Sequence, residues 1–110
     1  MMKHTILILF LFLSLLCHGQ SYKFFTTDRE LSSSLINKIY QDRNGMIWIA
    51  TEDGLNRYDG AKFITYKHDP ENEYSLCHNY VRVLYEDSKG RLFVGTYNGI
   101  QLYDPETDSF

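Results

Sequence analysis

Short hydrophobic runs alternate with polar turns along most of this chain, and the first series of runs covers 36–41, 46–50, 55–58 and 62–66. Runs of this length bounded by Asp, Asn and Gly are typical of β-strands. Asp53-Gly54 stands between the second and third runs, and Asp-Gly is a strong hairpin signal. The pattern predicts a four-stranded antiparallel sheet.

The run at 46–50 is apolar on both sides of the expected strand. Met46, Trp48 and Ala50 fall on one face, and Ile47 and Ile49 fall on the other. A strand with one wet face would alternate polar and apolar residues instead. This run is therefore expected to lie in a sheet that is covered on both faces.

The same pattern returns 45 residues later, so that 36–59 aligns with 81–104. Seven of these 24 positions are identical, and most others keep their character, as in Trp48 and Phe93. The second copy predicts strands at 81–86, 91–95 and 100–103, followed by a turn at 104–108. Repeats of about 40–50 residues built from short strands indicate β-propeller blades. The expected fold class is all-β, with about two four-stranded blades, the second one truncated, and a leading strand.

Two stacked blades would leave two of their four sheet faces open. Each open face would carry aromatic residues, which bury about 150–250 Å² apiece in a core. Such an area exceeds the few hundred Å² of apolar patch that a soluble monomer tolerates. We therefore expect the chain to be an incomplete fragment of a larger propeller, or else a non-functional truncated gene product.

The first residues read as an export signal rather than as part of the fold. Lys3 is followed by an apolar run at 6–16, which is about half the length that a membrane-spanning helix needs. Cleavage before Gln20 and lipidation of Cys17 are both open, although the bulky Leu16 argues against lipidation. The expected organisation is a signal peptide at 1–19, a leading strand and linker at 20–33, a first repeat at 34–66, an inter-blade loop at 67–79 and a second repeat at 80–110.

Charge and cysteine content exclude several classes of function. The chain has 11 Lys and Arg against 14 Asp and Glu, and no basic stripe suggests contact with nucleic acid. Only Cys77 remains after the signal peptide, so no disulfide is expected within this piece. Cys77 is expected to be a small, half-buried loop residue rather than a reactive thiol.

Several polar motifs resemble metal or catalytic sites but are better explained as turns. The loops that begin at Asp42 and Asp87 each lack the several carboxylates that calcium needs, so each aspartate is expected to accept backbone N–H groups. His68 and His78 stand ten residues apart, which is a poor spacing for zinc. Asp59 and Asp104 are expected to initiate turns, and Asp53 and Asn98 to serve hairpin geometry. We therefore expect no catalytic residue, no metal and no cofactor in this segment.

Aromatic residues could bind sugars, but most of them recur at matching repeat positions and so favour packing. Tyr74, Tyr80 and Tyr97 break the repeat pattern and are the better candidates for exposed contacts. The sequence alone assigns no ligand to them.

The repeated residues resemble a known family. The first copy carries Ile47-Trp48-Ile49-Ala50-Thr51 and then Asp53-Gly54-Leu55-Asn56-Arg57-Tyr58-Asp59-Gly60, which closely resembles the two-component regulator propeller repeat. The segment from His68 to Asn79 is similar to the inter-blade segment of that family. Phe93 departs from the pattern, because tryptophan is commonest there.

The resemblance implies the periplasmic sensor of a hybrid two-component system of Bacteroidetes-type bacteria. Such a protein is membrane-anchored, dimeric at full length, and carries further blades, a kinase, a receiver and a DNA-binding region. It is expected to respond to a glycan-derived oligosaccharide and to control transcription, with any kinase activity outside this chain. An alternative of another class is part of a secreted propeller enzyme acting on polysaccharide, although no carboxylate pair here suggests one.

Overall fold

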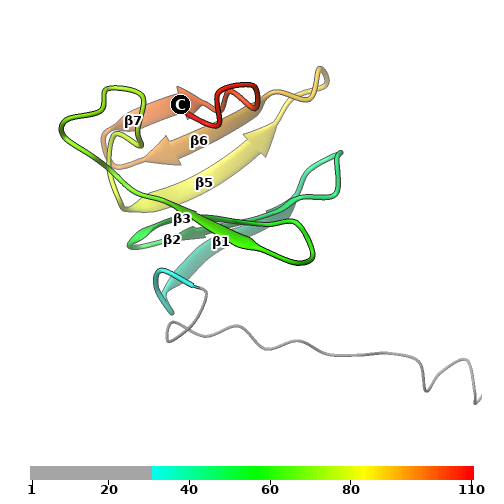
Figure 1. Cartoon of the computed structure of the whole chain (residues 1–110), viewed down its shortest axis with the longest axis horizontal. Helices are drawn as coiled ribbons and strands as arrows, with labels where there is room; N and C mark the ends of the chain where they lie inside the picture. The colour runs from blue at the N-terminus through cyan, green and yellow to red at the C-terminus, as the bar shows by residue number, and fades with distance from the viewer. Residues whose placement is uncertain (1–30) are drawn as a thin grey trace, which may run out of the picture.

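The computed structural model describes residues 31–110, and within them it contains strands and turns but no helix. The expected signal peptide, with Cys17, and residues 20–30 of the expected leading strand and linker lie outside these residues. The described part accordingly offers no helix of the length and apolarity that crossing a membrane would require. The seven strands form two antiparallel sheets, as Figure 1 shows.

The first sheet contains four strands in the order of the chain: β1 (Ile36–Gln41), β2 (Ile47–Thr51), β3 (Gly54–Tyr58) and β4 (Phe63–Tyr66). Each strand pairs with the next one along the sequence. The predicted strands are confirmed, and their ends differ from the observed ends by at most one residue.

The second sheet repeats this arrangement with β5 (Val81–Glu86), β6 (Leu92–Thr96) and β7 (Gly99–Leu102). After β7 the chain turns, and Asp104 and Ser109 form an isolated antiparallel bridge. The all-β fold class is therefore confirmed, with sheets of four and three strands.

Even an irregularity of strand pairing is repeated. The register between β1 and β2 shifts between Ile36 and Lys38, and the register between β5 and β6 shifts between Val81 and Val83. Beyond the shift, Tyr40 pairs with Trp48, just as Tyr85 pairs with Phe93. A shared bulge at equivalent positions shows that the sequence repeat is also a structural repeat.

The two sheets stack face to face, with β5 against β1 and β2. The first blade contributes to this core the face that carries Trp48. The second blade contributes the face that carries Leu84 and Val94, which is not the equivalent face in the repeat. The inter-blade loop adds Leu76 to the same core. The buried hydrophobic residues of this core are Trp48, Ala50, Leu55, Leu76, Val81, Leu84, Leu92, Val94 and Tyr103.

The face of the second blade that points away from the first is apolar and open. Val83, Tyr85, Phe93, Gly95 and Ile100 line a shallow depression there. Ile100 is 75% exposed, whereas Leu55, at the same repeat position in the first blade, is fully buried under the second blade. The expectation of an open blade face is therefore confirmed for the described residues.

The first blade has an open face of its own, opposite the core. Ile36 and Ile39 lie on it and are 42% and 58% exposed. Their repeat equivalents, Val81 and Leu84, are buried against the first blade. Each open face thus carries the residue types that form the inter-blade contact in the other copy.

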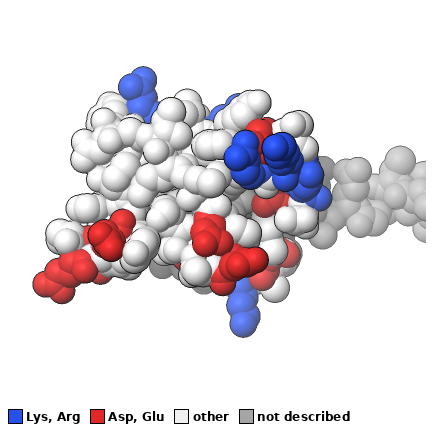
Figure 2. All heavy atoms as spheres, turned by 90° about the horizontal axis from the view of Figure 1, so that it is seen from above, with Lys and Arg blue, Asp and Glu red and all other residues white. Residues whose placement is uncertain are grey.

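Charged side chains avoid much of the surface in one view of the molecule. Figure 2 shows a continuous uncharged area with most of the carboxylates along one margin, a cluster of basic residues at one end and single basic residues elsewhere on the rim. This distribution contains no extended basic stripe on the face shown.

Candidate functional site

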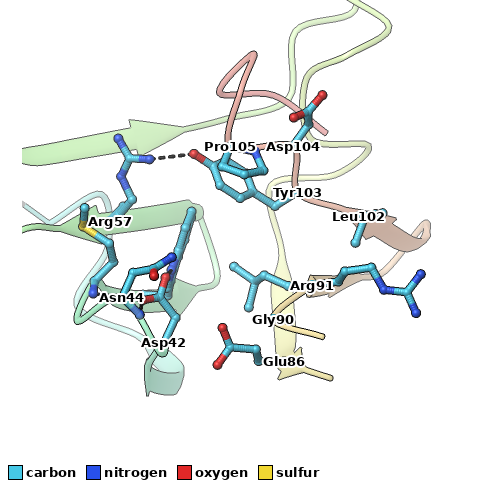
Figure 3. Close-up of a pocket in the computed structure, with 13 residues that line it drawn as sticks. Asp42, Asn44, Arg57, Glu86, Gly90, Arg91, Leu102, Tyr103, Asp104 and Pro105 are labelled. Carbon is cyan, nitrogen blue, oxygen red and sulfur yellow. Dashed lines mark hydrogen bonds between the residues drawn. The ribbon is translucent and has the colours of Figure 1, made fainter. Parts of the chain in front are cut away.

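A cleft of about 560 Å³ opens between the two blades, at the end of the sheets where β1 turns into β2. Figure 3 shows side chains from both blades that converge on it. Its walls combine apolar and charged groups, and the residues are Asp42, Asn44, Met46, Trp48, Arg57, Glu86, Gly90, Arg91, Leu92, Leu102, Tyr103, Asp104 and Pro105. Charged, aromatic and apolar side chains of both blades therefore meet in this cleft.

Trp48 forms the floor of the cleft on the side of the first blade and is only 1% exposed. Its indole N–H donates to Asp42 Oδ2 at 2.9 Å. The other carboxylate oxygen, Oδ1, accepts the backbone N–H groups of Asn44 and Met46 at 2.9 and 3.0 Å. One aspartate therefore fixes both the β1–β2 turn and the orientation of the tryptophan.

Arg57 connects the two blades across the cleft. Its Nη1 donates to the Tyr103 hydroxyl at 2.6 Å, the bond drawn in Figure 3, and lies 3.3 Å from Asp108 Oδ1. The guanidinium also lies over the Trp48 ring, 5.7 Å from its centroid. Such a cation–π contact is stabilising when it is shielded from water.

Two tyrosine hydroxyls complete this network on Asp108. Tyr66 donates to Asp108 Oδ1 at 2.5 Å, and Tyr103 donates to the same atom at 2.7 Å. Burial raises the pKa of Tyr66 and the pKa of Tyr103, so both hydroxyls stay protonated and act as donors near neutral pH. The network ties β3 and β4 of the first blade to the 104–108 turn of the second.

Glu86 occupies the opposite wall, and its charge is also engaged. It accepts the Tyr40 hydroxyl and the backbone N–H of Arg43, both at 3.1 Å. Arg43 Nη2 in turn donates to the carbonyl of Ser88 at 2.8 Å. The charged groups of the cleft thus hold turns and tyrosines in place, so the arrangement suits a joint between blades better than acid–base catalysis.

The aspartates assigned to turns do accept the backbone groups of those turns. Asp87 Oδ1 accepts the N–H groups of Lys89 and Arg91 at 3.0 and 2.9 Å. The hydrogen bond from the Arg91 backbone holds the pKa of Asp87 below its usual value. Asp59 Oδ1 accepts from Ala61 and Lys62, both at 2.8 Å.

The histidines and the cysteine of the inter-blade loop have separate partners. His68 Nδ1 lies 2.6 Å from the carbonyl of Leu76. Cys77 is half-buried, with its Sγ 3.0 Å from Thr96 Oγ1. Among residues 31–110, no cluster of three or more His, Cys, Asp or Glu side chains has the arrangement of a metal site.

The three tyrosines that break the repeat pattern divide into a pair and a single residue. Tyr80 and Tyr97 stack on each other with their ring centroids 4.1 Å apart. Tyr74 is 60% exposed on the inter-blade loop, where its carbonyl accepts the backbone N–H of Phe110. His78 and Arg82 lie next to Tyr97, a position that the sequence analysis did not predict for either residue. The sequence does mark both positions as departures from the repeat, because their equivalents in the first copy are Ser33 and Asn37.

Comparison with known proteins adds a family and several relatives. Residues 30–53 and 75–98 match the profile described as the two-component regulator propeller. A protein named histidine kinase P4, from Formosa agariphila, is 41% identical over 73 residues. This match covers 63% of the present chain and 5% of the relative.

Two solved structures from B. thetaiotaomicron share the fold. The first is the extracellular domain assigned to a hybrid two-component system, with 34% identity and a TM-score of 0.69 over 80% of this chain. The second is the extracellular domain assigned to a one-component system, with 25% identity and a TM-score of 0.64 over 81% of this chain. The chain spans only 12% and 13% of the lengths of these two structures.

Proposed function

Because this chain carries two-component regulator propeller repeats, we propose that it forms part of the extracytoplasmic sensor of a hybrid two-component signal-transduction protein. The sensor binds a glycan-derived ligand and controls transcription through a kinase domain elsewhere in the same polypeptide. The observation that carries the proposal is the 34% identity to the extracellular domain of a hybrid two-component system, over most of this chain.

Three further observations support this role. The curated relative is a histidine kinase by name, and both solved relatives are extracellular domains. The apolar run at 6–16 has the form of an export signal. The charged groups of the inter-blade cleft are engaged in structure, which favours a binding or scaffolding module over a catalyst.

The nearest partner in this proposal is a further blade of the same polypeptide. The open face of the second blade carries Val83, Tyr85 and Ile100 where the first blade carries its contact with the second. A third sheet with the pattern of Val81, Leu84 and Val94 would cover that face as the second sheet covers the first. We further propose that the full-length protein is a membrane-anchored dimer that holds this segment on the periplasmic side of the inner membrane.

The proposal is tested in the bacterium that encodes the chain. Codons for residues 34–110 are deleted in frame, and transcripts are measured on a panel of purified polysaccharides as carbon sources. We expect induction of one gene set on one polysaccharide to be lost and to return when the intact gene is restored. Unchanged induction on every polysaccharide would contradict a sensory role.

A further inference from the structure

Three of the hydrogen bonds that join the two blades link pairs of side chains whose positions recur in the repeat. The pairs are Glu52 with Tyr80 at 2.8 Å, Arg57 with Tyr103 at 2.6 Å and Tyr40 with Glu86 at 3.1 Å. In each pair the first residue belongs to the first blade and its partner belongs to the second. Because the repeat places an equivalent of each residue on the open side of one blade, those equivalents show what a further joint requires.

The pair of Glu52 and Tyr80 is replaced on both open sides. Tyr97 stands at the repeat position of Glu52, and Leu35 stands at that of Tyr80. Both replacements are more than half exposed. A carboxylate has thus become an aromatic ring, and the hydroxyl that it bonded has become an aliphatic side chain. Each replacement would leave the other blade's original residue without its hydrogen bond, whereas the two replacements suit each other as an apolar contact.

The pair of Arg57 and Tyr103 changes in the same coordinated way. Leu102 takes the position of Arg57 and has no donor to offer, and Tyr58 takes the position of Tyr103. The Tyr58 hydroxyl donates to the carbonyl of Gly60 in its own blade at 2.6 Å. The arginine can therefore be absent from the second blade without leaving the hydroxyl of such a tyrosine unpaired.

The pair of Tyr40 and Glu86 is kept as a donor and an acceptor. Tyr85 stands at the position of Tyr40 on the open face of the second blade, and Gln41 stands at the position of Glu86 on the open side of the first. The amide oxygen of a glutamine accepts a tyrosine hydroxyl as a carboxylate does, but it brings no charge into the contact. All three positions thus match across the two open faces.

We propose that the open face of the second blade binds a blade face of one chemistry. That face has an aliphatic residue where the second blade has Tyr80, an uncharged amide where it has Glu86, and a tyrosine bonded within its own blade where it has Tyr103. The open face of the first blade fits this description. This inference rests on the proposed function, because its partner is the further blade of that proposal, and it states how that blade is recognised.

A face of the second blade's own kind is the wrong partner. It would bring the Tyr80 hydroxyl against Tyr97 and the Tyr103 hydroxyl against Leu102. Tyr97 and Leu102 offer neither the carboxylate nor the guanidinium to which those hydroxyls bond in the observed joint. A buried hydroxyl without its partner weakens binding, so the open face discriminates between two blades of similar shape.

The chain supplies its own probe, because the first blade of one copy can meet the second blade of another. Ile39→Asp blocks the open face of the first blade, and Ile100→Asp blocks that of the second; both isoleucines are exposed in the single chain. A buried, unpaired carboxylate should weaken the blocked contact by about a hundredfold or more. In sedimentation velocity we expect each variant of residues 20–110 alone to be a monomer, and a mixture of the two to form a 1:1 complex.

A pair swap between the two partners tests the residues of the contact. Tyr97→Glu, added to the Ile39→Asp chain, should weaken the complex by about tenfold, because its carboxylate then faces Leu35. Leu35→Tyr, added to the Ile100→Asp chain, should restore most of that loss by rebuilding the pair of Glu52 and Tyr80 between the copies. Because the repair lies in the other molecule, it cannot come from refolding of the Tyr97→Glu chain.

Tyr74→Asp is the matched control, because it places a carboxylate at an exposed aromatic position outside both faces and should leave the complex intact. Absence of the 1:1 complex, self-association of either blocked chain, or failure of Leu35→Tyr to restore binding would overturn the proposal. If the complex fails while deletion of residues 34–110 still abolishes transcriptional induction in cells, the recognition of blades is wrong and the sensory function stands.

Discussion

At the scale of single residues, Asp42 has two structural roles. It closes the β1–β2 turn through the N–H groups of Asn44 and Met46, and it receives the indole N–H of Trp48. The equivalent residue, Asp87, closes its turn in the same way and pairs with Arg91 at 2.6 Å. Phe93 stands where Trp48 does and has no N–H to offer, so the two aspartates should differ in their contribution to stability.

We predict that Asp42→Ala lowers the free energy of unfolding more than Asp87→Ala does. The Asp42 variant leaves a buried indole N–H without its acceptor, which costs about 1–3 kcal/mol in addition to the loss of the turn. The Asp87 variant loses turn hydrogen bonds and an ion pair with the exposed Arg91, and such a pair contributes little to stability because water screens it. Urea denaturation of both variants gives the difference, and equal losses would mean that the Trp48 bond adds nothing.

The roles of these aspartates could be predicted from the sequence because a turn is a local structure. Asp42 and Gly45 lie three residues apart, and their hydrogen bonds follow from that spacing. The bond between Arg57 and Tyr103 could not be predicted, because it joins residues 46 positions apart through the packing of two sheets. The same limit applies to Arg82, which reaches Tyr97 only once β5 and β6 are in register.

At the scale of the elements, the β2–β3 hairpin is packed more tightly than its copy in the second blade. Gly54 has a φ of +118°, and a Cβ placed there would lie 2.8 Å from the Tyr66 carbonyl oxygen. Its N–H donates to the Asn79 carbonyl at 2.6 Å, which ties the hairpin to the inter-blade loop. Gly99 has a φ of +128°, but nothing lies within 4 Å of the corresponding Cβ position.

We predict that Gly54→Ala lowers the free energy of unfolding more than Gly99→Ala does. The difference is the cost of the close contact with the Tyr66 carbonyl oxygen. Both variants place an alanine at positive φ, which costs about 1–2 kcal/mol. Gly54→Ala should cost about 1–3 kcal/mol more, because the backbone of β4 must also move. Thermal melting of the two variants tests this, and a Gly99→Ala variant as unstable as Gly54→Ala would show that only the backbone angle matters.

The strands themselves were predictable because each blade is built from neighbouring segments. Alternating runs and Asp-Gly turns fix strand length and order without knowledge of the tertiary fold. What the runs did not reveal is which face of each sheet is covered. Trp48 and Phe93 have the same pattern in the sequence, yet Trp48 is buried between the blades and Phe93 borders an open depression.

At the scale of the whole molecule, the two open faces are complementary. One carries Ile36 and Ile39, and the other carries Val83, Tyr85 and Ile100. A contact between faces that differ is heterologous, so copies of this chain can add head to tail. The chain on its own is therefore expected to associate.

We predict that residues 20–110, produced alone, self-associate and melt over a broad range. Ile100→Ser should shift the population toward monomer and raise the dissociation constant by about ten- to a hundredfold, because burying an isoleucine contributes about 1.5–3 kcal/mol. Leu55→Ser, at the same repeat position but in the core, should unfold the first blade instead. Sedimentation velocity measures the association, and a wild-type monomer with a sharp melting transition would contradict the prediction.

Every strand in both sheets pairs with the strand next to it along the sequence. Contacts of such short sequence separation form quickly and cost little loop entropy. A chain threaded through a membrane pore from its N-terminus can therefore finish its first sheet before the last strands have emerged. The strands then pair in the same order in which they leave the pore. Each completed sheet offers an apolar face against which the next sheet can pack.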